Sequence, residues 1–257
     1  MHAYGSGAVI KVPAPSTPEG WIRAEAHYAD AARGAGAPAP RLLGVEEVDG
    51  RAASVWERVR GTSIWQLVVD RPEQSAALGE LLADVQHGLF ELVPPVTLPR
   101  QRDRLVSKIR RAAATVDPSL GRALAFLPAP VGSPRLCHGD LHPSNVLLAS
   151  DGPVIVDWFD ASRGDPVADV ARSSVTLLND GANPPEHLPG ADPATLGVLT
   201  GAYLARLRER MAIDDDILAR WQAVSAVGRI AEGVARGPLL DVWERFQSAS
   251  SVHAAAN

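Results

Sequence analysis

The sequence predicts an α+β fold of two lobes, a short β-sheet lobe over residues 1–59 and a mainly helical lobe over residues 60–257. Two observations support this prediction. Segments rich in β-branched residues, separated by Gly-containing turns, are concentrated before residue 60. After it, apolar residues recur at spacings of three and four, which is typical of amphipathic helices. A chain of 257 residues is long enough for two lobes that share one core.

The first lobe is expected to contain four strands and one helix. Residues 4–12 contain the end of one strand, a Gly-rich turn and a second strand. Residues 41–48 and 53–59 form the other two strands, joined by a turn at Asp49-Gly50. A helix is expected over residues 19–35. Its stripe of mostly apolar residues consists of Trp21, Ala24, Tyr28 and Ala31.

The second lobe is expected to be helical on both sides of a central loop. Its first long helix carries an apolar stripe made of Leu78, Leu81, Leu82, Val85, Leu89 and Leu92. A basic helical stretch follows over residues 100–116, and we expect its charged side chains to form a solvated face, with contact to an anion or to the acceptor as the alternative. Asp-Pro pairs that begin at Asp117, Asp165 and Asp192 predict further helix starts, because Asp caps a helix and Pro suits its first turn. Residues 214–216 are three acids that begin another helix, where carboxylates favour the helix dipole.

The central loop has the residue spacing of a phosphoryl-transfer site. His138-Gly139-Asp140 is followed by four residues and then Asn145. In the catalytic loop of kinases with this spacing, the Asp accepts the proton of the attacking hydroxyl and the Asn holds magnesium. Apolar runs on both sides of Ser150-Asp151-Gly152 then predict a hairpin. With Asp151 at its tip, Asn145 and Asp157 would pair at its open end and supply two oxygen ligands to magnesium.

Each of these residues alone has an ordinary structural explanation, because Asp and Asn beside strands are usually turn or cap residues. The hypothesis of a catalytic site depends on their combination. The spacing of the loop, the hairpin and the second acid brings all three to one place.

The run from Leu136 to Trp158 resembles the aminoglycoside phosphotransferase family of small-molecule kinases, which is similar in fold to protein kinases. The family's loop has His-Gly-Asp with a Pro before the Asn, and its second motif, Ile-Asp-Trp or Ile-Asp-Phe, corresponds here to Val156-Asp157-Trp158. The resemblance extends from about Val9 to Arg172, and more loosely through the helical C-terminus. It implies a two-lobed protein-kinase-like fold whose last helices build the acceptor pocket. The resemblance is specific for the superfamily, but it indicates little about the substrate.

The resemblance also implies a nucleotide site. Lys11 occupies the position of the strand lysine that contacts the α- and β-phosphates, and Glu25 that of the helix glutamate that pairs with it. Glu57 and Val59 lie where the chain crosses between the lobes, so their backbone groups are expected to contact the base. In the family, a further strand and a nucleotide-covering loop precede the lysine strand. This lobe is therefore expected to be shortened, either in the protein itself or by a late start of the chain.

Two further acids have roles by the same resemblance. Asp169 corresponds to an acid that braces the backbone of the catalytic loop, although a favourable carboxylate in the first helical turn would explain it equally well. Asp160 lies close in sequence to the metal pair. It is expected to contact metal-bound water or the acceptor, or merely to cap the following turn.

These residues imply a phosphotransferase that moves the γ-phosphoryl group of ATP, with GTP as the alternative, to a hydroxyl of a small molecule. The catalytic residues would be Asp140, Asn145 and Asp157, with the last two holding Mg²⁺. The acceptor would be an aminoglycoside-like antibiotic, as in antibiotic resistance, or a sugar or amino-alcohol metabolite. A protein Ser/Thr kinase is one alternative, but the short stretch from Asp157 to Asp165 contains no activation segment. A non-catalytic binding protein with a degraded nucleotide lobe is another, but it has no physical need for the base and both metal ligands.

The composition excludes several classes of partner. A net charge of −5 argues against nucleic-acid binding, since no basic excess is present to meet a phosphate backbone. The single cysteine, Cys137, excludes an internal disulfide and is expected to be a small buried apolar residue. No apolar run reaches membrane-spanning length, and the N-terminus lacks a signal-peptide pattern. We therefore expect a cytoplasmic protein, of an oligomeric state that the sequence does not indicate.

Overall fold

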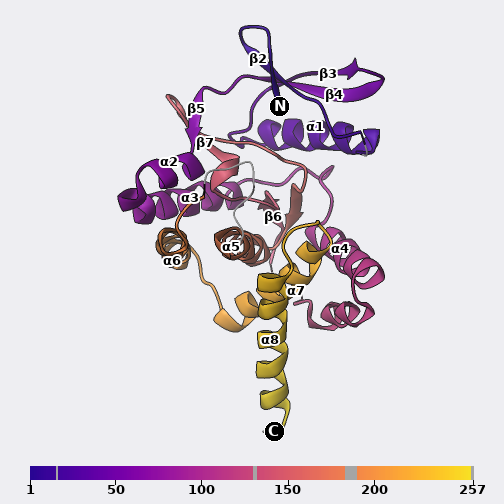
Figure 1. The fold of residues 1–257 in the computed structure, drawn as a ribbon, viewed down its shortest axis with the longest axis vertical. Coiled ribbons are helices and arrows are strands. Elements are labelled where there is room, and N and C mark those ends of the chain that lie inside the picture. Colours follow the sequence, from indigo (N-terminus) through magenta and orange to yellow (C-terminus); the bar gives the residue numbers. More distant parts are fainter. Residues whose placement is uncertain (16, 130–131, 183–189, 256–257) are drawn as a thin grey trace.

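The computed structural model describes residues 1–15, 17–129, 132–182 and 190–255. Two lobes are stacked along the long axis of the molecule (Figure 1). The upper lobe contains an antiparallel sheet and one helix, and the lower lobe is mainly helical, with the C-terminal helix projecting from its base. The predicted α+β fold of two lobes is confirmed.

The sheet of the upper lobe has four antiparallel strands in the order β1-β2-β4-β3. Their bounds are β1 His2–Tyr4, β2 Ala8–Lys11, β3 Leu42–Val48 and β4 Arg51–Glu57. Asp49 and Gly50 have φ angles of 50° and 72°, the left-handed conformations that a tight two-residue hairpin turn requires. The four strands and this turn are therefore placed as the sequence predicts.

Helix α1, Glu19–Gly34, lies beneath the sheet but buries a different face from the predicted one (Figure 1). Its buried residues are Ile22, Glu25, Ala26, Ala29 and Ala32. Trp21, which the predicted stripe included, is 45% exposed. The buried face is made of small residues and one acid, Glu25, which an ion pair with Lys11 holds inside. Hydrophobic periodicity detects large apolar residues, and it does not detect a face made of small residues and an acid. The prediction was wrong for this reason.

The lower lobe is built from seven α-helices and three 3₁₀ turns in the described part of the chain. The α-helices are α2 Ile64–Asp70, α3 Ser75–Phe90, α4 Gln101–Thr115, α5 Pro166–Ala182, α6 Pro193–Arg210, α7 Asp215–Ile230 and α8 Gly237–Ala255. The 3₁₀ segments are η1 Pro72–Gln74, η2 Pro118–Phe126 and η3 Pro143–Asn145. In the described residues we find no helix with both the length and the apolar character needed to cross a bilayer.

The helix starts and the leucine stripe agree with the sequence. The side chains of Asp117, Asp165 and Asp192 each accept a backbone N–H at a helix start. Leu82 and Leu89 of α3 are fully buried. Helix α3 packs against α6. The two helices pack so closely that a Cβ at Gly79 would collide with the backbone of α6. Packing of this density holds the lower lobe rigid behind the catalytic loop.

A small sheet in the order β5-β7-β8 contains the predicted hairpin, and a second pair of strands flanks it. The strands are β5 Gly61–Ser63, β6 Arg135–Cys137, β7 Val146–Ala149, β8 Gly152–Ile155 and β9 Ser162–Gly164. Cys137 is buried and free, as predicted.

The register of the β7–β8 hairpin differs by one residue from the predicted one. Ala149 pairs with Gly152, so the turn has two residues rather than three, and the φ of 120° at Gly152 permits it. Asn145 therefore faces Val156, whose N–H donates to the Asn145 carbonyl at 2.9 Å. Asp157 lies one residue beyond this pair. The two residues remain at the same end of the hairpin, but they are not cross-strand partners.

Candidate active site

The loop His138-Gly139-Asp140 is held by one buried carboxylate. Asp169 of α5 accepts the N–H of Gly139 at 2.8 Å and that of His138 at 3.2 Å. It also accepts a hydrogen bond from Gln86 of α3 at 2.9 Å. Burial raises the pKa of Asp169, and these donors oppose that rise. The predicted bracing contact of Asp169 is confirmed.

Glycine is required at the centre of this loop. Gly139 has a φ of 82°, and a Cβ there would collide with the backbone of Asp160. A side chain at this position would push the loop away from the following turn. The His-Gly-Asp sequence therefore follows from the close approach of two backbone segments as well as from chemistry.

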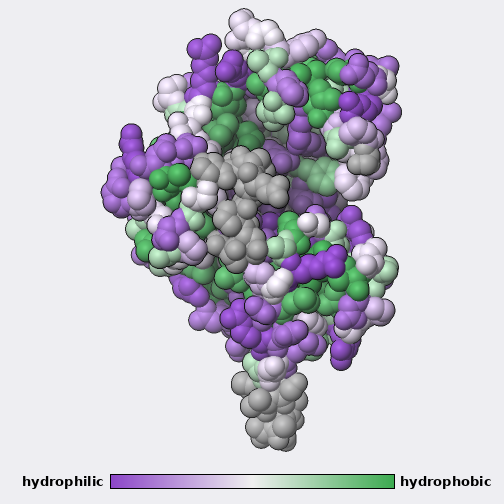
Figure 2. Space-filling model, in the orientation of Figure 1, coloured by the Kyte–Doolittle hydropathy of each residue, from purple (hydrophilic) through white to green (hydrophobic). Residues whose placement is uncertain are grey.

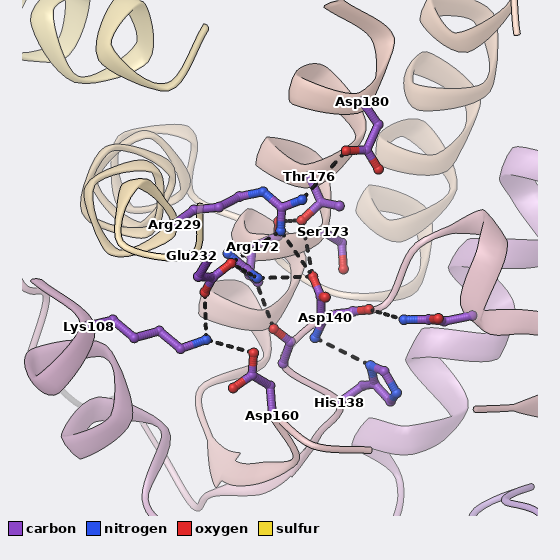
Figure 3. Close-up of polar contacts among 12 residues, drawn as sticks. Lys108, His138, Asp140, Asp160, Arg172, Ser173, Thr176, Asp180, Arg229 and Glu232 are labelled. Carbon is purple, nitrogen blue, oxygen red and sulfur yellow. Dashed lines mark hydrogen bonds and ion pairs between the residues drawn. The ribbon is translucent and has the colours of Figure 1, made fainter. Parts of the chain in front are cut away.

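The side chain of Asp140 points toward Arg172 of α5 and Arg229 of α7 (Figure 3). Its Oδ1 lies 3.1 Å from Arg172 Nη2, 3.3 Å from Arg229 Nη1 and 3.4 Å from Thr176 Oγ1. Its Oδ2 has no hydrogen-bond partner in the part of the chain that the structure describes. Burial alone would raise the pKa of Asp140, but the positive charges around it, Arg172 first, hold that pKa well below its usual range. The carboxylate is therefore ionised, with one oxygen anchored and one left to accept a proton.

The two arginines belong to an ion-pair network that joins three helices (Figure 3). Glu232, just beyond the end of α7, lies 2.7 Å from Arg172 Nη2 and 2.8 Å from Lys108 Nζ. Lys108 of α4 also lies 2.6 Å from Asp160. Arg172 also binds the backbone of the catalytic loop, because its Nε donates to the Gly139 carbonyl at 3.1 Å. The network fixes the helices that surround the catalytic loop.

Asn145 and Asp157 offer oxygen atoms at the other side of the loop. Asn145 donates its Nδ2 to the Asp140 carbonyl at 3.0 Å, which leaves Oδ1 for another partner. The side chain of Asp157 is 49% exposed, and its backbone φ is 63°, an uncommon conformation for a residue other than glycine. No cluster of three or more His, Cys, Asp or Glu that could hold a metal occurs among the described residues. A magnesium ion on these two side chains would therefore take its remaining ligands from phosphate and water, as magnesium commonly does.

Lys11 of β2 lies between two carboxylates. Its Nζ is 2.6 Å from Glu25 Oε1 and 3.2 Å from Asp157 Oδ1. Burial would lower the pKa of Lys11, but the charges of Asp157 and Glu25 outweigh that effect and raise it. The ion pair between Lys11 and Glu25 that the resemblance implies is therefore present. Their roles toward a nucleotide stay predictions.

A cavity of about 250 Å³ lies between the lobes. The predicted nucleotide and metal residues all line it, together with the indole of Trp56. They are Lys11, Glu25, Glu57, Val59, Asn145 and Asp157. The surface is visibly hollowed between the upper and lower lobes, and hydrophilic residues are seen there (Figure 2). The Glu57 carboxylate accepts the Arg41 N–H at 2.8 Å, which fixes the chain where it leaves β4 for the lower lobe.

The charged network around Asp140 is not predicted from the sequence. Residues 100–116 were expected to present a solvated charged face, but Arg104 and Lys108 point inward to Asp160, at 3.2 and 2.6 Å. Asp160 is thus an ion-pair partner rather than the cap of a turn. Arg172 could have been found, because it stands three residues after Asp169 and so shares a helix face with it. Arg229 and Glu232 have no local pattern that marks them.

Comparisons with known proteins agree with this architecture. The model of a family described as the phosphotransferase enzyme family matches residues 3–212. Among solved structures, the aminoglycoside phosphotransferase APH(3'')-Id from Streptomyces rimosus is similar with a TM-score of 0.63 and 20% identity, over 88% of each chain. An aminoglycoside-3'-phosphotransferase of type VIII gives a TM-score of 0.58 and 22% identity, over 82% of this chain and 81% of that one.

A glucosamine kinase is similar with a TM-score of 0.53 and 22% identity, over 98% of this chain and 74% of that one. It has been solved with glucosamine, ADP and inorganic phosphate, and the Streptomyces protein with ADP and streptomycin. A comparison with curated proteins finds no match. The structural likenesses confirm the predicted kinase-like fold.

Proposed function

The chain belongs to the phosphotransferase enzyme family, and from this premise we propose that it transfers the γ-phosphoryl group of ATP to a hydroxyl of a small molecule. One observation carries the proposal. Asp140, with an oxygen free to accept a proton, lies in the same loop as Asn145, which lines the inter-lobe cavity together with Lys11 and Asp157. A base, two oxygen ligands and a phosphate-binding cation are the components that phosphoryl transfer requires.

In the proposed reaction Asp140 orients the acceptor hydroxyl and accepts its proton on Oδ2 as the oxygen bonds to the γ-phosphorus. The bond from that phosphorus to the β-phosphate oxygen breaks, and ADP leaves. Lys11 neutralises the α- and β-phosphates, and Glu25 holds its ammonium in place at 2.6 Å. Asn145 Oδ1 and Asp157 would hold Mg²⁺, which when bound would neutralise negative charge on the phosphates.

The backbone of Glu57 and Val59 is proposed to contact the base, because both residues line the cavity where the chain crosses between the lobes. ATP is the proposed donor, with GTP as the alternative. The glucosamine and streptomycin bound by similar proteins suggest a hydroxylated sugar or an aminoglycoside as first acceptors to test. A donor of this kind also implies a cytoplasmic location.

The proposal favours a small acceptor over a protein substrate. Only residues 158–165 separate Asp157 from the start of α5 at Pro166. A segment of this length leaves little room for a platform that positions a peptide.

Calorimetry with Mg-ATP and Mg-GTP tests the proposal. Mg-ATP should bind the wild-type chain, and Asp157→Asn should weaken that binding about 10- to 100-fold, the usual size of a lost charge-assisted interaction. Asp151→Asn, at the exposed tip of the hairpin, is the matched control and should bind like the wild type. Equal binding by the wild type and Asp157→Asn would contradict the metal assignment, and no binding by the wild type would contradict the proposed function.

A further inference from the structure

The carboxylates on the acceptor side of Asp140 are already paired with basic groups. Asp160 has Lys108 and Arg104, Glu232 has Arg172 and Lys108, and Asp180 has Arg229. Asp140 itself faces two arginines. A polycationic acceptor could bind one of these carboxylates only by displacing the basic side chain that already pairs with it. The three acids at residues 214–216 do not help, because they begin α7, whereas Arg229 stands at its other end.

Of the two arginines in this network whose Nε is buried without a hydrogen-bond partner among the described residues, Arg104 and Arg229, only Arg229 contacts Asp140. Its side chain is 7% exposed, and its Nε is buried with no hydrogen-bond partner among the described residues. Its distances to Asp140, Asp180 and Glu232 are 3.3, 3.5 and 3.5 Å. The corresponding contacts of Arg172 to Glu232 and Asp140 are shorter, at 2.7 and 3.1 Å. Burial, and after it the like charge of Arg172, lower the pKa of Arg229, although Asp140, Glu232 and Asp180 act in the opposite direction.

Arg229 also lies beside the carboxylate that the acceptor hydroxyl must reach. A hydroxyl that donates to Asp140 Oδ2 lies against the same carboxylate whose Oδ1 is 3.3 Å from Arg229 Nη1. Groups one or two carbons from the reacting hydroxyl are therefore within reach of the guanidinium. An acid at that distance could give Arg229 a shorter charge-assisted contact than the contacts of 3.3 and 3.5 Å that the protein itself supplies.

We propose that Arg229 binds an anionic group of the acceptor, so that the preferred acceptor is a hydroxy acid whose carboxylate or phosphate lies one or two carbons from the phosphorylated hydroxyl. This inference rests on the proposed function, because it assigns the acceptor class of the same site. Arg229 acts as a specificity residue, whereas Arg172, which is bonded to Glu232 and the Gly139 carbonyl, positions Asp140.

The test compares glycerate with glycerol, two acceptors that differ in having a carboxylate or an alcohol at the same carbon. Each is titrated by calorimetry into the full chain saturated with Mg-ADP, with glucosamine as the cationic comparator. Glycerate should bind at least about tenfold more tightly than either of the others, as a charge-assisted pair commonly achieves. Arg229→Gln should remove this preference, and Arg229→Lys, which keeps the charge, should retain part of it.

Two controls separate this role from a structural one. Arg208→Gln removes an exposed arginine that pairs with Asp215 and should leave the preference unchanged. Arg229→Gln should bind Mg-ADP like the wild type, and with ATP it should raise KM for glycerate more than it lowers kcat. A merely structural role would change the Mg-ADP affinity or lower kcat for every acceptor.

Each outcome decides between the two proposals. If the wild type binds Mg-ADP but shows no preference for glycerate, or if Arg229→Gln keeps the preference, the anionic acceptor is wrong and the proposed function stands. If the wild type does not bind Mg-ADP, the proposed function fails, and the assignment of Arg229 fails with it.

Discussion

The two sides of the loop that carries Asp140 satisfy their charges in different ways. On the nucleotide side, Asp157 is 49% exposed and strained in φ, and it faces a cavity of about 250 Å³. On the acceptor side, Asp140 is enclosed by Arg172 and Arg229, which are themselves tied to Glu232. The first region keeps Asp157 accessible to a ligand, although Lys11 pairs with it at 3.2 Å, and the second region uses most of its charged groups to hold the protein together. Removal of a charge should therefore cost mainly binding on one side, and both activity and stability on the other.

The largest effect is expected at Asp140. Asp140→Asn should lower kcat about 10²–10⁴-fold, the usual contribution of a positioned general base. Mg-ADP affinity should change little, because Asp140 does not line the nucleotide cavity. Steady-state kinetics with calorimetry checks both, and Asp151→Asn serves as the matched control. A large loss of Mg-ADP affinity in Asp140→Asn would mean that the two sides are not separate.

Asp169 should show the largest effect on stability. In Asp169→Asn an NH₂ group replaces one of the two oxygens that accept from Gly139, His138 and Gln86. A buried donor would then face a donor, which typically costs about 2–4 kcal/mol. Urea denaturation measures the loss. Asp192→Asn, at the exposed cap of α6, should be nearly neutral because Asn caps as well as Asp. Equal stability of the two variants would show that Asp169 is not the brace described above.

Asp157→Asn sharpens the comparison because it should weaken Mg-nucleotide binding while leaving stability almost unchanged. Asn tolerates a φ of 63° at least as well as Asp does, and the side chain is half exposed. The free energy of unfolding without nucleotide should change by less than about 0.5 kcal/mol. Chemical denaturation with and without Mg-ADP separates the two quantities. A destabilisation as large as that of Asp169→Asn would remove the distinction between the two regions.

The smallest expected effect is a dependence of stability on pH at Asp140. The folded-state pKa of this carboxyl lies below its ordinary value of about 3.9, so its ion pairs stabilise the protein above that pH. Their contribution is lost as the pH falls through the folded-state pKa. The difference in unfolding free energy between the wild type and Asp140→Asn, about 1 kcal/mol near pH 7, should therefore shrink below pH 4. Denaturation curves from pH 7 to pH 3 measure it, and a difference that grows on acidification would contradict the assigned sign.

The same contrast explains how far the sequence predicts the site. On the nucleotide side, Asn145 and Asp157 flank one hairpin in the sequence and so meet at its open end, and Lys11 and Glu25 lie on consecutive elements, so local patterns suffice to find them. The one-residue error in register arose because the turn length depends on the conformation of Gly152. On the acceptor side, Lys108 lies far along the chain from Arg229 and Glu232, and nothing local distinguishes the three from surface charges. The helix caps were predictable, whereas the buried face of α1 was not, because it depends on a polar partner in another element.

The buried Asp169 should also slow the exchange of the catalytic loop's amide protons with solvent. The amides of His138 and Gly139 end on a carboxylate that α5 supplies and that Gln86 of α3 anchors. These two amide protons stay protected from solvent exchange as long as the buried carboxylate holds them. The catalytic loop should therefore belong to the slowest-exchanging unit of the protein, although its sequence has the polar composition of an ordinary surface loop.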